Sequence, residues 1–328
     1  SIEGPVTVYV SMPQTGPRAA DGEDAADGVR LALEEAGMRA GSVEVRAEFL
    51  DDARGRPWDP VAVGANARIA VQDSSAAAYI GELDSEPTRA SVPITNDAGL
   101  LQVSPGAGAV DLTRPATGYP ESPQRYQPSG SQSFARTVPA DDVQVSAAAA
   151  WASELGFRRV AVISDGTPHQ SLMEQEFTDA AEARGVEVAD RAITAGAAAL
   201  RGVPVYDVAA QALDRRDGGP GLRTSALLDP SRLPGQGFVG AFSNRFGREP
   251  GPYAAYGYEA MALILQSIAE AGTDASEFRD EVREGAFGAE RPDSILGGYS
   301  IDSDGDTTEC MIQRYRAEEP LGAPCPPS

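Results

Sequence analysis

The sequence predicts an α/β fold in which helices join the strands of parallel sheets. Two observations carry this prediction: strand-like and helix-like segments alternate at short intervals, and the same scheme recurs in both halves of the 328-residue chain. No sequence repeat is obvious. The length suffices for two domains, and an apolar content of 41% supports a substantial core.

The first half of the chain shows the clearest alternation. We expect strands at 6–10, 42–52, 76–81 and 100–105, and helices at 25–37, 59–73 and 85–99. Gly37 is suited to end the first helix, and Asp59-Pro60 is suited to begin the second, with a capping carboxylate followed by proline. Residues 113–134 carry four prolines and predict a long surface loop, not a linker.

The second half begins in the same way and then becomes less regular. A helix is expected within 134–156, and the segments that follow are a strand at 158–166, a helix at 171–185 and a strand at 186–194. Beyond Ala195 the only helical candidate before Gly221 is 205–216. Residues 222–272 return to a strand, a loop and two helices, and the pieces 291–306 and 309–319 predict a closing β-hairpin.

Charge and cysteine usage exclude several classes of function. The net charge of −22 would repel nucleic acid and anionic membrane surfaces. No run of 18 apolar residues could span a bilayer, and the first residues lack a secretion signal, so the protein is either cytoplasmic or has lost its signal. Cys310 and Cys325, without a nearby histidine, form a poor zinc site. A disulfide between them would add about 3 kcal/mol and favours an exported protein.

Small and hydroxyl-bearing residues follow three of the expected strands. They lie in the loops that begin near residues 11, 81 and 104. Ligands of open parallel sheets bind beyond the carboxyl ends of the strands, and small residues let a ligand approach backbone N–H groups. We therefore expect the loops around residues 16, 85 and 106 to converge on a crevice. Ser85 either caps the following helix or shares the helix N-terminus with a ligand carboxylate.

Several stretches, taken in order, resemble the leucine/isoleucine/valine-binding protein family, the type I periplasmic solute-binding proteins of ABC transporters. The stretches are VSMPQTGPRAADGEDAADGVRLALEEAG, DDARGRPWDPVAVGANARIAVQD, YIGELDSEPTRASVPITNDAGLLQVSPGAGAVDLT, RRVAVISDGTPHQSLMEQEFTDAAEARGVEV and FGREPGPYAAYGYEAMALILQSIAEAG. The resemblance implies two Rossmann-like, doubly wound lobes joined by a multi-strand hinge. It places the N-terminal lobe at 1–138 with 253–275 returning to it, a shortened C-terminal lobe at 139–252, and a hinge crossing with a C-terminal hairpin at 276–328.

The resemblance also implies ligand-binding positions. Ser85 falls where the family places a hydroxyl for a ligand carboxylate, and Gly106 and Ala107 fall on a loop that supplies backbone groups. The family's threonine in that loop falls on Gly108, which weakens an amino-acid pocket. Four further family positions have counterparts here. An aromatic residue of the family's first loop falls on Asp21, and an aspartate near the start of its second lobe falls on Asp141. A family tyrosine falls on His169, and another family aromatic residue falls on Tyr253.

Each of these residues also has a structural interpretation. Asp21 and Asp84 would suit a cation or a polyhydroxylated ligand better than leucine, because buried carboxylates need partners. The structural alternative for Asp21 is a solvated loop residue, and the alternative for Asp84 is a turn or cap residue. His169 follows a turn signal and could lie on a surface loop, and Tyr253 could pack in the core. Arg136 could pair with a loop carboxylate.

Two further features bear on function. About 27 residues bridge Ala195 to Leu222 where the family has roughly one more strand–helix unit, so either the lobe is trimmed or residues are missing from the numbered chain. The stretch Asp302–Glu309 has calcium-like Asp spacing but lacks the glycine position and flanking helices of an EF-hand, which favours a hairpin turn. No hydrolase motif accompanies His169, and no metal or cofactor site is expected.

The sequence thus predicts a non-enzymatic receptor that captures a small polar solute, such as an amino acid, between two lobes by hinge closure. Its partner would be an ABC permease. We expect it to be exported to the periplasm or cell surface, a location that is compatible with a lipid anchor upstream of Ser1. Two alternatives stay open: a ligand sensor of the same fold that signals to a partner protein, and an α/β enzyme.

Overall fold

The computed structural model describes residues 4–193, 203–215, 221–273 and 277–327. The chain divides into two compact units. Unit 1 comprises Ser1–Arg114, Glu121–Val138 and Leu233–Glu309, and unit 2 comprises Pro115–Pro120, Pro139–Arg232 and Cys310–Ser328. Residues 113–134, expected as one surface loop, therefore contribute to both units. Tyr126 in this segment is buried in the core of unit 1.

Unit 1 contains a six-stranded sheet in the order β2-β3-β1-β4-β5-β6. All neighbouring strands are parallel except the short pair β2–β3. The strands are β1 (Val6–Met12), β2 (Arg39–Ala40), β3 (Val43–Asp51), β4 (Ala76–Ile80), β5 (Leu101–Ser104) and β6 (Phe134–Arg136). The predicted α/β fold with parallel strands and crossover helices is confirmed in this unit.

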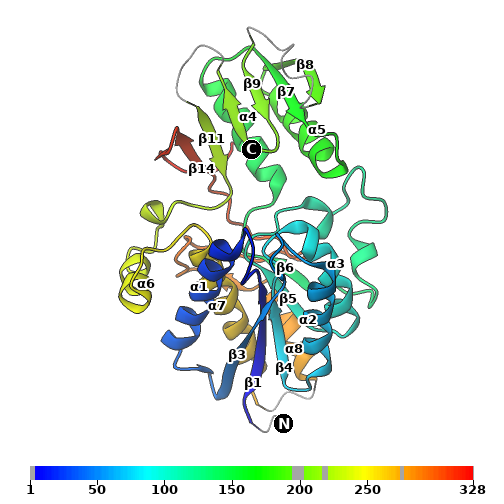
Figure 1. The fold of residues 1–328 in the computed structure, drawn as a ribbon, viewed down its shortest axis with the longest axis vertical. Coiled ribbons are helices and arrows are strands. Elements are labelled where there is room, and N and C mark those ends of the chain that lie inside the picture. The colour runs from blue at the N-terminus through cyan, green and yellow to red at the C-terminus, as the bar shows by residue number, and fades with distance from the viewer. Residues whose placement is uncertain (1–3, 194–202, 216–220, 274–276, 328) are drawn as a thin grey trace. The chain divides into compact units, whose positions relative to one another are not determined.

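Helices cover both faces of this sheet (Figure 1). On one face α1 (Ala19–Glu35), α7 (Ala254–Ala271) and α8 (Phe278–Ala286) pack on Val8 and Val10 of β1. On the other face α2 (Pro60–Gln72) and α3 (Ser85–Asp97) lie over Tyr9, whose side chain points the opposite way because strand residues alternate. Asp59 caps α2 as predicted: its carboxylate accepts hydrogen bonds from the backbone N–H groups of Val61 and Ala62, both at 2.9 Å.

Helices α1 and α7 approach each other closely because glycines face each other across the contact. A Cβ on Gly28 would collide with the carbonyl oxygen of Ala254, and a Cβ on Gly257 would collide with that of Ala25. The buried carboxylate of Asp24 also joins the two helices. It accepts hydrogen bonds from the N–H groups of Gly251 (2.7 Å) and Ala254 (2.8 Å), and so caps the start of α7.

Unit 2 has a seven-stranded sheet in the order β15-β14-β11-β10-β9-β7-β8. Only β8, β7 and β9 run parallel, and the remaining neighbours are antiparallel. The strands are β7 (Arg159–Ser164), β8 (Glu187–Ile193), β9 (Val205–Asp207), β10 (Ala212–Asp214), β11 (Leu222–Ser225), β14 (Gln313–Arg316) and β15 (Glu319–Pro320). The core of unit 2 lies between this sheet and the helices α4 (Asp141–Glu154) and α5 (Pro168–Glu182).

The predicted helix at 205–216 is wrong. The segment forms β9 and β10, which pair antiparallel through a short turn, with Tyr206 stacked on Phe177 at 3.9 Å between ring centroids. Residues 194–202 and 216–220 lie outside the described residues. In the part that is described, β9 thus leads directly to β10 where the resemblance implies a further strand–helix unit.

The C-terminal pairing also differs from the expectation. The segments 291–306 and 309–319 do not form one hairpin: β12 (Glu290–Arg291) pairs with β13 (Tyr299–Ser300), whereas β14 pairs with β11 and β15. The turn predicted at Asp302–Glu309 is present. Gly305 has a left-handed φ of 95°, and Ile301 and Thr307 bridge across the turn.

Two segments lie in a different unit from the one that the expected division of the chain implies. Residues 233–252, expected in the C-terminal lobe, lie in unit 1, because α6 (Phe238–Phe246) packs on α7 through an edge-on contact of Phe238 with Tyr258 at 5.4 Å. Residues 310–328 lie in unit 2, where the predicted disulfide joins Cys310 to Cys325. None of the helices within the described ranges is long and apolar enough to cross a membrane.

The close contact of α1 with α7 gives a direct test of packing. Gly28→Ala should lower the free energy of unfolding by about 2 kcal/mol or more, because the added methyl group forces the helices apart. The matched control is Gly240→Ala, another helical glycine, whose Cβ would meet nothing within 4 Å. The free energy of unfolding of Gly240→Ala should rise by up to about 1 kcal/mol. Urea unfolding of both variants measures the difference, and equal stabilities would refute the close contact.

Candidate functional site

Arg18 connects three loops at the carboxyl ends of the unit 1 strands. Its Nε donates to Asp21 Oδ2 at 2.8 Å, its Nη1 to Asp84 Oδ2 at 2.7 Å and its Nη2 to the Tyr253 hydroxyl at 3.0 Å. Arg18 precedes α1, Asp84 follows β4, and Tyr253 precedes α7. We call these four residues the Arg18 cluster. The structure thus brings together three residues that the sequence analysis named separately, around a fourth that it did not name.

The loop after β5 lies against the same region. Gly106 lies where a Cβ would collide with the carbonyl oxygen of Leu83 and approach the Tyr253 ring to 3.0 Å, so only glycine fits. The Ser85 hydroxyl accepts a hydrogen bond from the N–H of Ala109 at 3.0 Å. The loops near residues 18, 85 and 106 therefore converge within unit 1, as the small residues at the strand ends predict.

Asp84 is not a helix cap in the usual sense. It occupies the N-cap position of α3, yet its carboxylate makes no capping hydrogen bond and points to Arg18. Burial raises the pKa of Asp84, although Arg18 opposes this effect. Burial also raises the pKa of Tyr253 to about 12. Arg18 itself has a raised pKa, since the negative charge of Asp84 and the other partners outweigh the burial that lowers it.

A layer of buried polar groups lies beneath the Arg18 cluster. Glu82 is completely buried and accepts hydrogen bonds from the hydroxyls of Ser11 (2.6 Å) and Tyr79 (2.7 Å). After burial, the charge of Asp52, which is 1% exposed, is the largest influence on the Glu82 carboxyl group. Two buried carboxyl groups that interact in this way favour a state in which they share one proton over a state with two negative charges. Burial raises the pKa of Asp52 to about 6, and burial and the charge of Asp52 raise that of Glu82 well above its ordinary range.

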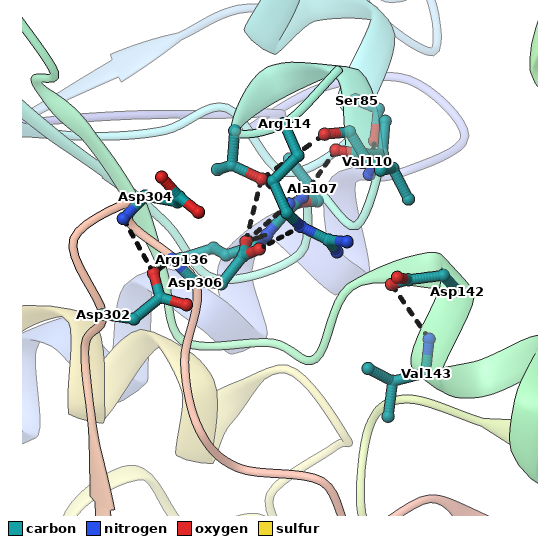
Figure 2. A network of polar contacts seen from close by, with 12 residues as sticks. Ser85, Ala107, Val110, Arg114, Arg136, Asp142, Val143, Asp302, Asp304 and Asp306 are labelled. Atoms are coloured by element: carbon teal, nitrogen blue, oxygen red, sulfur yellow. Dashed lines mark hydrogen bonds and ion pairs between the residues drawn. The ribbon is translucent and has the colours of Figure 1, made fainter. Parts of the chain in front are cut away.

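Arg136 fixes the other side of the loop after β5. Figure 2 shows Arg136 and Arg114 turned toward Asp306. The fully buried Arg136 donates from Nε to Asp306 at 2.7 Å and from Nη1 to the carbonyl oxygens of Ala107 (3.0 Å) and Ala109 (2.7 Å). The expectation that Arg136 pairs with a loop carboxylate is confirmed. Burial alone would raise the pKa of Asp306, but the two arginines lower it below the ordinary value.

In unit 2 the remaining two predicted residues lie together. Asp141 begins α4 and His169 lies in the first turn of α5, and the distance from Asp141 Oδ2 to His169 Nε2 is 3.5 Å. The other ring nitrogen, Nδ1, is buried and has no hydrogen-bond partner among the described residues. The pair lies near the carboxyl end of β7, where ligands of parallel sheets bind.

Two cavities of ligand size within unit 1 are lined by other residues. One of about 540 Å³ lies between α1 and α7, next to Glu35, Tyr258 and Arg291. The second, of about 430 Å³, lies between α1 and the edge of the sheet, next to Met12 and Phe49. Within the described ranges, no group of three or more His, Cys, Asp or Glu residues is placed to hold a metal ion.

Arg18, Asp52 and Glu82 were not predicted as site residues from the sequence. Arg18 carries a weak local signal, because it stands three residues before Asp21, a spacing at which opposite charges on a helix meet. The contacts of Arg18 with Asp84 and Tyr253 span 66 and 235 residues and have no local signal.

The carboxyl pair predicts a specific pH dependence of stability. The folded chain binds these protons more tightly than the unfolded chain, so the pair lowers the free energy of unfolding as pH rises from about 4 through 6. In Glu82→Gln no second carboxyl group has to be protonated, and the variant should gain stability relative to the native chain between about pH 5 and pH 8.

Urea unfolding across this range measures the effect. Glu23→Gln, which changes an exposed carboxylate, is the control and should follow the native chain. A constant difference between Glu82→Gln and the native chain at every pH would show that the pair does not share a proton.

Comparisons with known proteins identify the family. Its sequence pattern, that of the periplasmic binding proteins, matches residues 5–220. A Leu/Ile/Val-binding protein, BraC3 of Rhizobium johnstonii, is 28% identical over 195 residues, which are 58% of this chain and 48% of the relative. The chain thus spans about half the length of the curated relative that it matches.

Solved structures share the fold. The leucine-binding protein LivK of Thermotoga maritima has a TM-score of 0.74 at 19% identity, covering 97% of this chain and 98% of that protein. A solute-binding protein of R. palustris in complex with benzoate has a TM-score of 0.75 at 18% identity, covering 98% of this chain and 97% of that protein. LivJ of Streptococcus pneumoniae in complex with isoleucine has a TM-score of 0.74 at 15% identity, covering 98% of this chain and 99% of that protein. With two thirds of its residues matched to the family pattern, the chain belongs to the periplasmic binding protein family.

Proposed function

We propose that this protein is an extracytoplasmic receptor that captures a small polar solute and delivers it to an ABC permease, without chemical change of the solute. Membership of the periplasmic binding protein family supports this proposal, as does the similarity to a Leu/Ile/Val-binding protein. Proteins with the same fold bind leucine, isoleucine or benzoate. The disulfide between Cys310 and Cys325 supports an exported protein.

The convergence of three loops around Arg18 is the observation that carries the proposal. Polar side chains from the loops next to β1, β4 and α7 meet there, and the carboxylates of Asp21 and Asp84 are 42% and 37% exposed. Polar groups that converge but stay accessible are typical of a binding site and not of a core. We assign ligand contacts in unit 1 to Ser85, Gly106 and Ala107, with the Arg18 cluster beside them.

We further propose that Asp141 and His169 of unit 2 contact the same ligand when the protein closes. A ligand that bonds to both units stabilises the closed state relative to the open state, and so shifts the population toward it. Asp141 holds the His169 ring through Nε2, so Nδ1, which has no hydrogen-bond partner among the described residues, is the ring nitrogen left to bond to a ligand.

A screen of thermal unfolding tests the proposal. Amino acids, amides, amines, sugars and aromatic acids are added singly, and the true ligand class should raise the melting temperature. At 100 times its dissociation constant a ligand adds about 2.7 kcal/mol to the stability. Ser85→Ala should reduce this increment by about half or more, measured relative to the variant's own unliganded stability. Ser42→Ala, which changes an exposed serine of unit 1, is the control.

The absence of a shift with every solute class would overturn the receptor proposal. An undiminished shift in Ser85→Ala would instead remove Ser85 from the site.

A further inference from the structure

Three backbone N–H groups of the loop after β5 already have hydrogen-bond partners within unit 1. The N–H groups of Gly106 (3.2 Å) and Ala107 (2.9 Å) both donate to the Ser104 hydroxyl, and the N–H of Ala109 donates to Ser85. The Ser104 hydroxyl in turn donates to the carbonyl oxygen of Glu82 at 2.6 Å. A ligand carboxylate could accept a hydrogen bond from the Ser85 hydroxyl. To bond to any of the three N–H groups it would first have to displace these internal bonds, which weakens its recognition.

Acceptors in the Arg18 cluster, in contrast, are available. Asp21 and Asp84 each bond to Arg18 through Oδ2, and no hydrogen bond from any described residue reaches their Oδ1 atoms. One guanidinium and two carboxylates leave one negative charge uncompensated. Asp84 and Glu86 also flank the N-terminus of α3 and offset the positive end of that helix. Both the charge and the free lone pairs therefore favour a positively charged group.

Arg18 determines where these acceptors point. Its three partners occupy separate nitrogens, a geometry that a planar guanidinium provides and a lysine ammonium does not. The guanidinium also lies 5.8 Å from the centroid of the Tyr253 ring, which limits its movement. The Oδ1 atoms of the two aspartates are consequently held in place before a ligand arrives.

We propose that Arg18 is a positioning residue that holds Asp21 and Asp84 for an ammonium or guanidinium group, so that the protein selects organic cations over carboxylates. This inference rests on the proposed receptor function, because it concerns the charge of the ligand at that same site. It departs from the carboxylate-first recognition that the resemblance implies for Ser85.

Three sets of compounds with matched carbon skeletons test the ligand charge. Each set contains an amine, the parent amino acid and the acid without its amino group. The sets are isoamylamine, leucine and 4-methylpentanoate; phenethylamine, phenylalanine and 3-phenylpropanoate; and isobutylamine, valine and 3-methylbutanoate. Xylitol serves as an uncharged polyol, and the best solute from the thermal screen is included. Calorimetry should show the amine of the preferred skeleton binding at least tenfold more tightly than the matching acid.

Variants distinguish a role of Arg18 and Asp84 in ligand selection from a contribution to the stability of the fold alone. Asp84→Asn should reduce the ratio of amine to acid affinity by tenfold or more, whereas a purely structural role would weaken both compounds alike. Arg18→Met should reduce this ratio similarly, and Arg18→Lys should restore part of it. Arg245→Met is the control, because Arg245 pairs with Glu34 on the surface of unit 1 and should leave the ratio unchanged.

The outcomes distinguish the two proposals. Preference for an acid or for xylitol, or an unchanged ratio in Asp84→Asn, would overturn the cation inference and leave the receptor function standing. Failure of every compound and every screened solute to bind would overturn the receptor function, and with it this inference.

Discussion

The contact of one arginine with three chain segments is the interaction on which the site in unit 1 depends. Arg18 joins residues 66 and 235 positions away along the chain, so the site exists only if the sheet and the helices place those segments correctly. The parallel pairing of β1 with β4 places Asp84. The glycine-mediated approach of α1 and α7, with Asp24 capping α7, places Tyr253. The packing of the sheet and the helices thus brings the polar side chains of the Arg18 cluster together.

Charged groups inside unit 1 then hold the loops in place. The Asp52–Glu82 pair supports the loop that leads to Asp84, and Arg136 holds the carbonyl groups of the loop after β5. Buried carboxyl and guanidinium groups cost desolvation free energy, which good hydrogen bonding offsets. In this chain the buried groups connect the loops after β4 and β5 to residues of β1 and β6.

Local signals in the sequence predict the local structure of this chain. The alternation of strands and helices identifies the sheet of unit 1, and Asp59 marks the start of α2. The small residues after the strands indicate which loops converge. The helix at 278–286 escaped prediction, and 205–216 formed strands against its helical pattern, because pairing with β7 and β11 outweighs local propensity there. The contacts of Arg18 with Asp84 and Tyr253 could not be predicted from local signals, since they depend on tertiary packing.

A double-mutant cycle between Arg18 and Asp84 tests the central claim most directly. The free energy of unfolding is measured for the native chain, Arg18→Met, Asp84→Asn and the double variant. The short, partly buried ion pair predicts a coupling of about 1 kcal/mol or more, above the usual value for an exposed pair. A coupling near zero would show that the guanidinium does not join these loops, and would contradict the central role of Arg18 in the site.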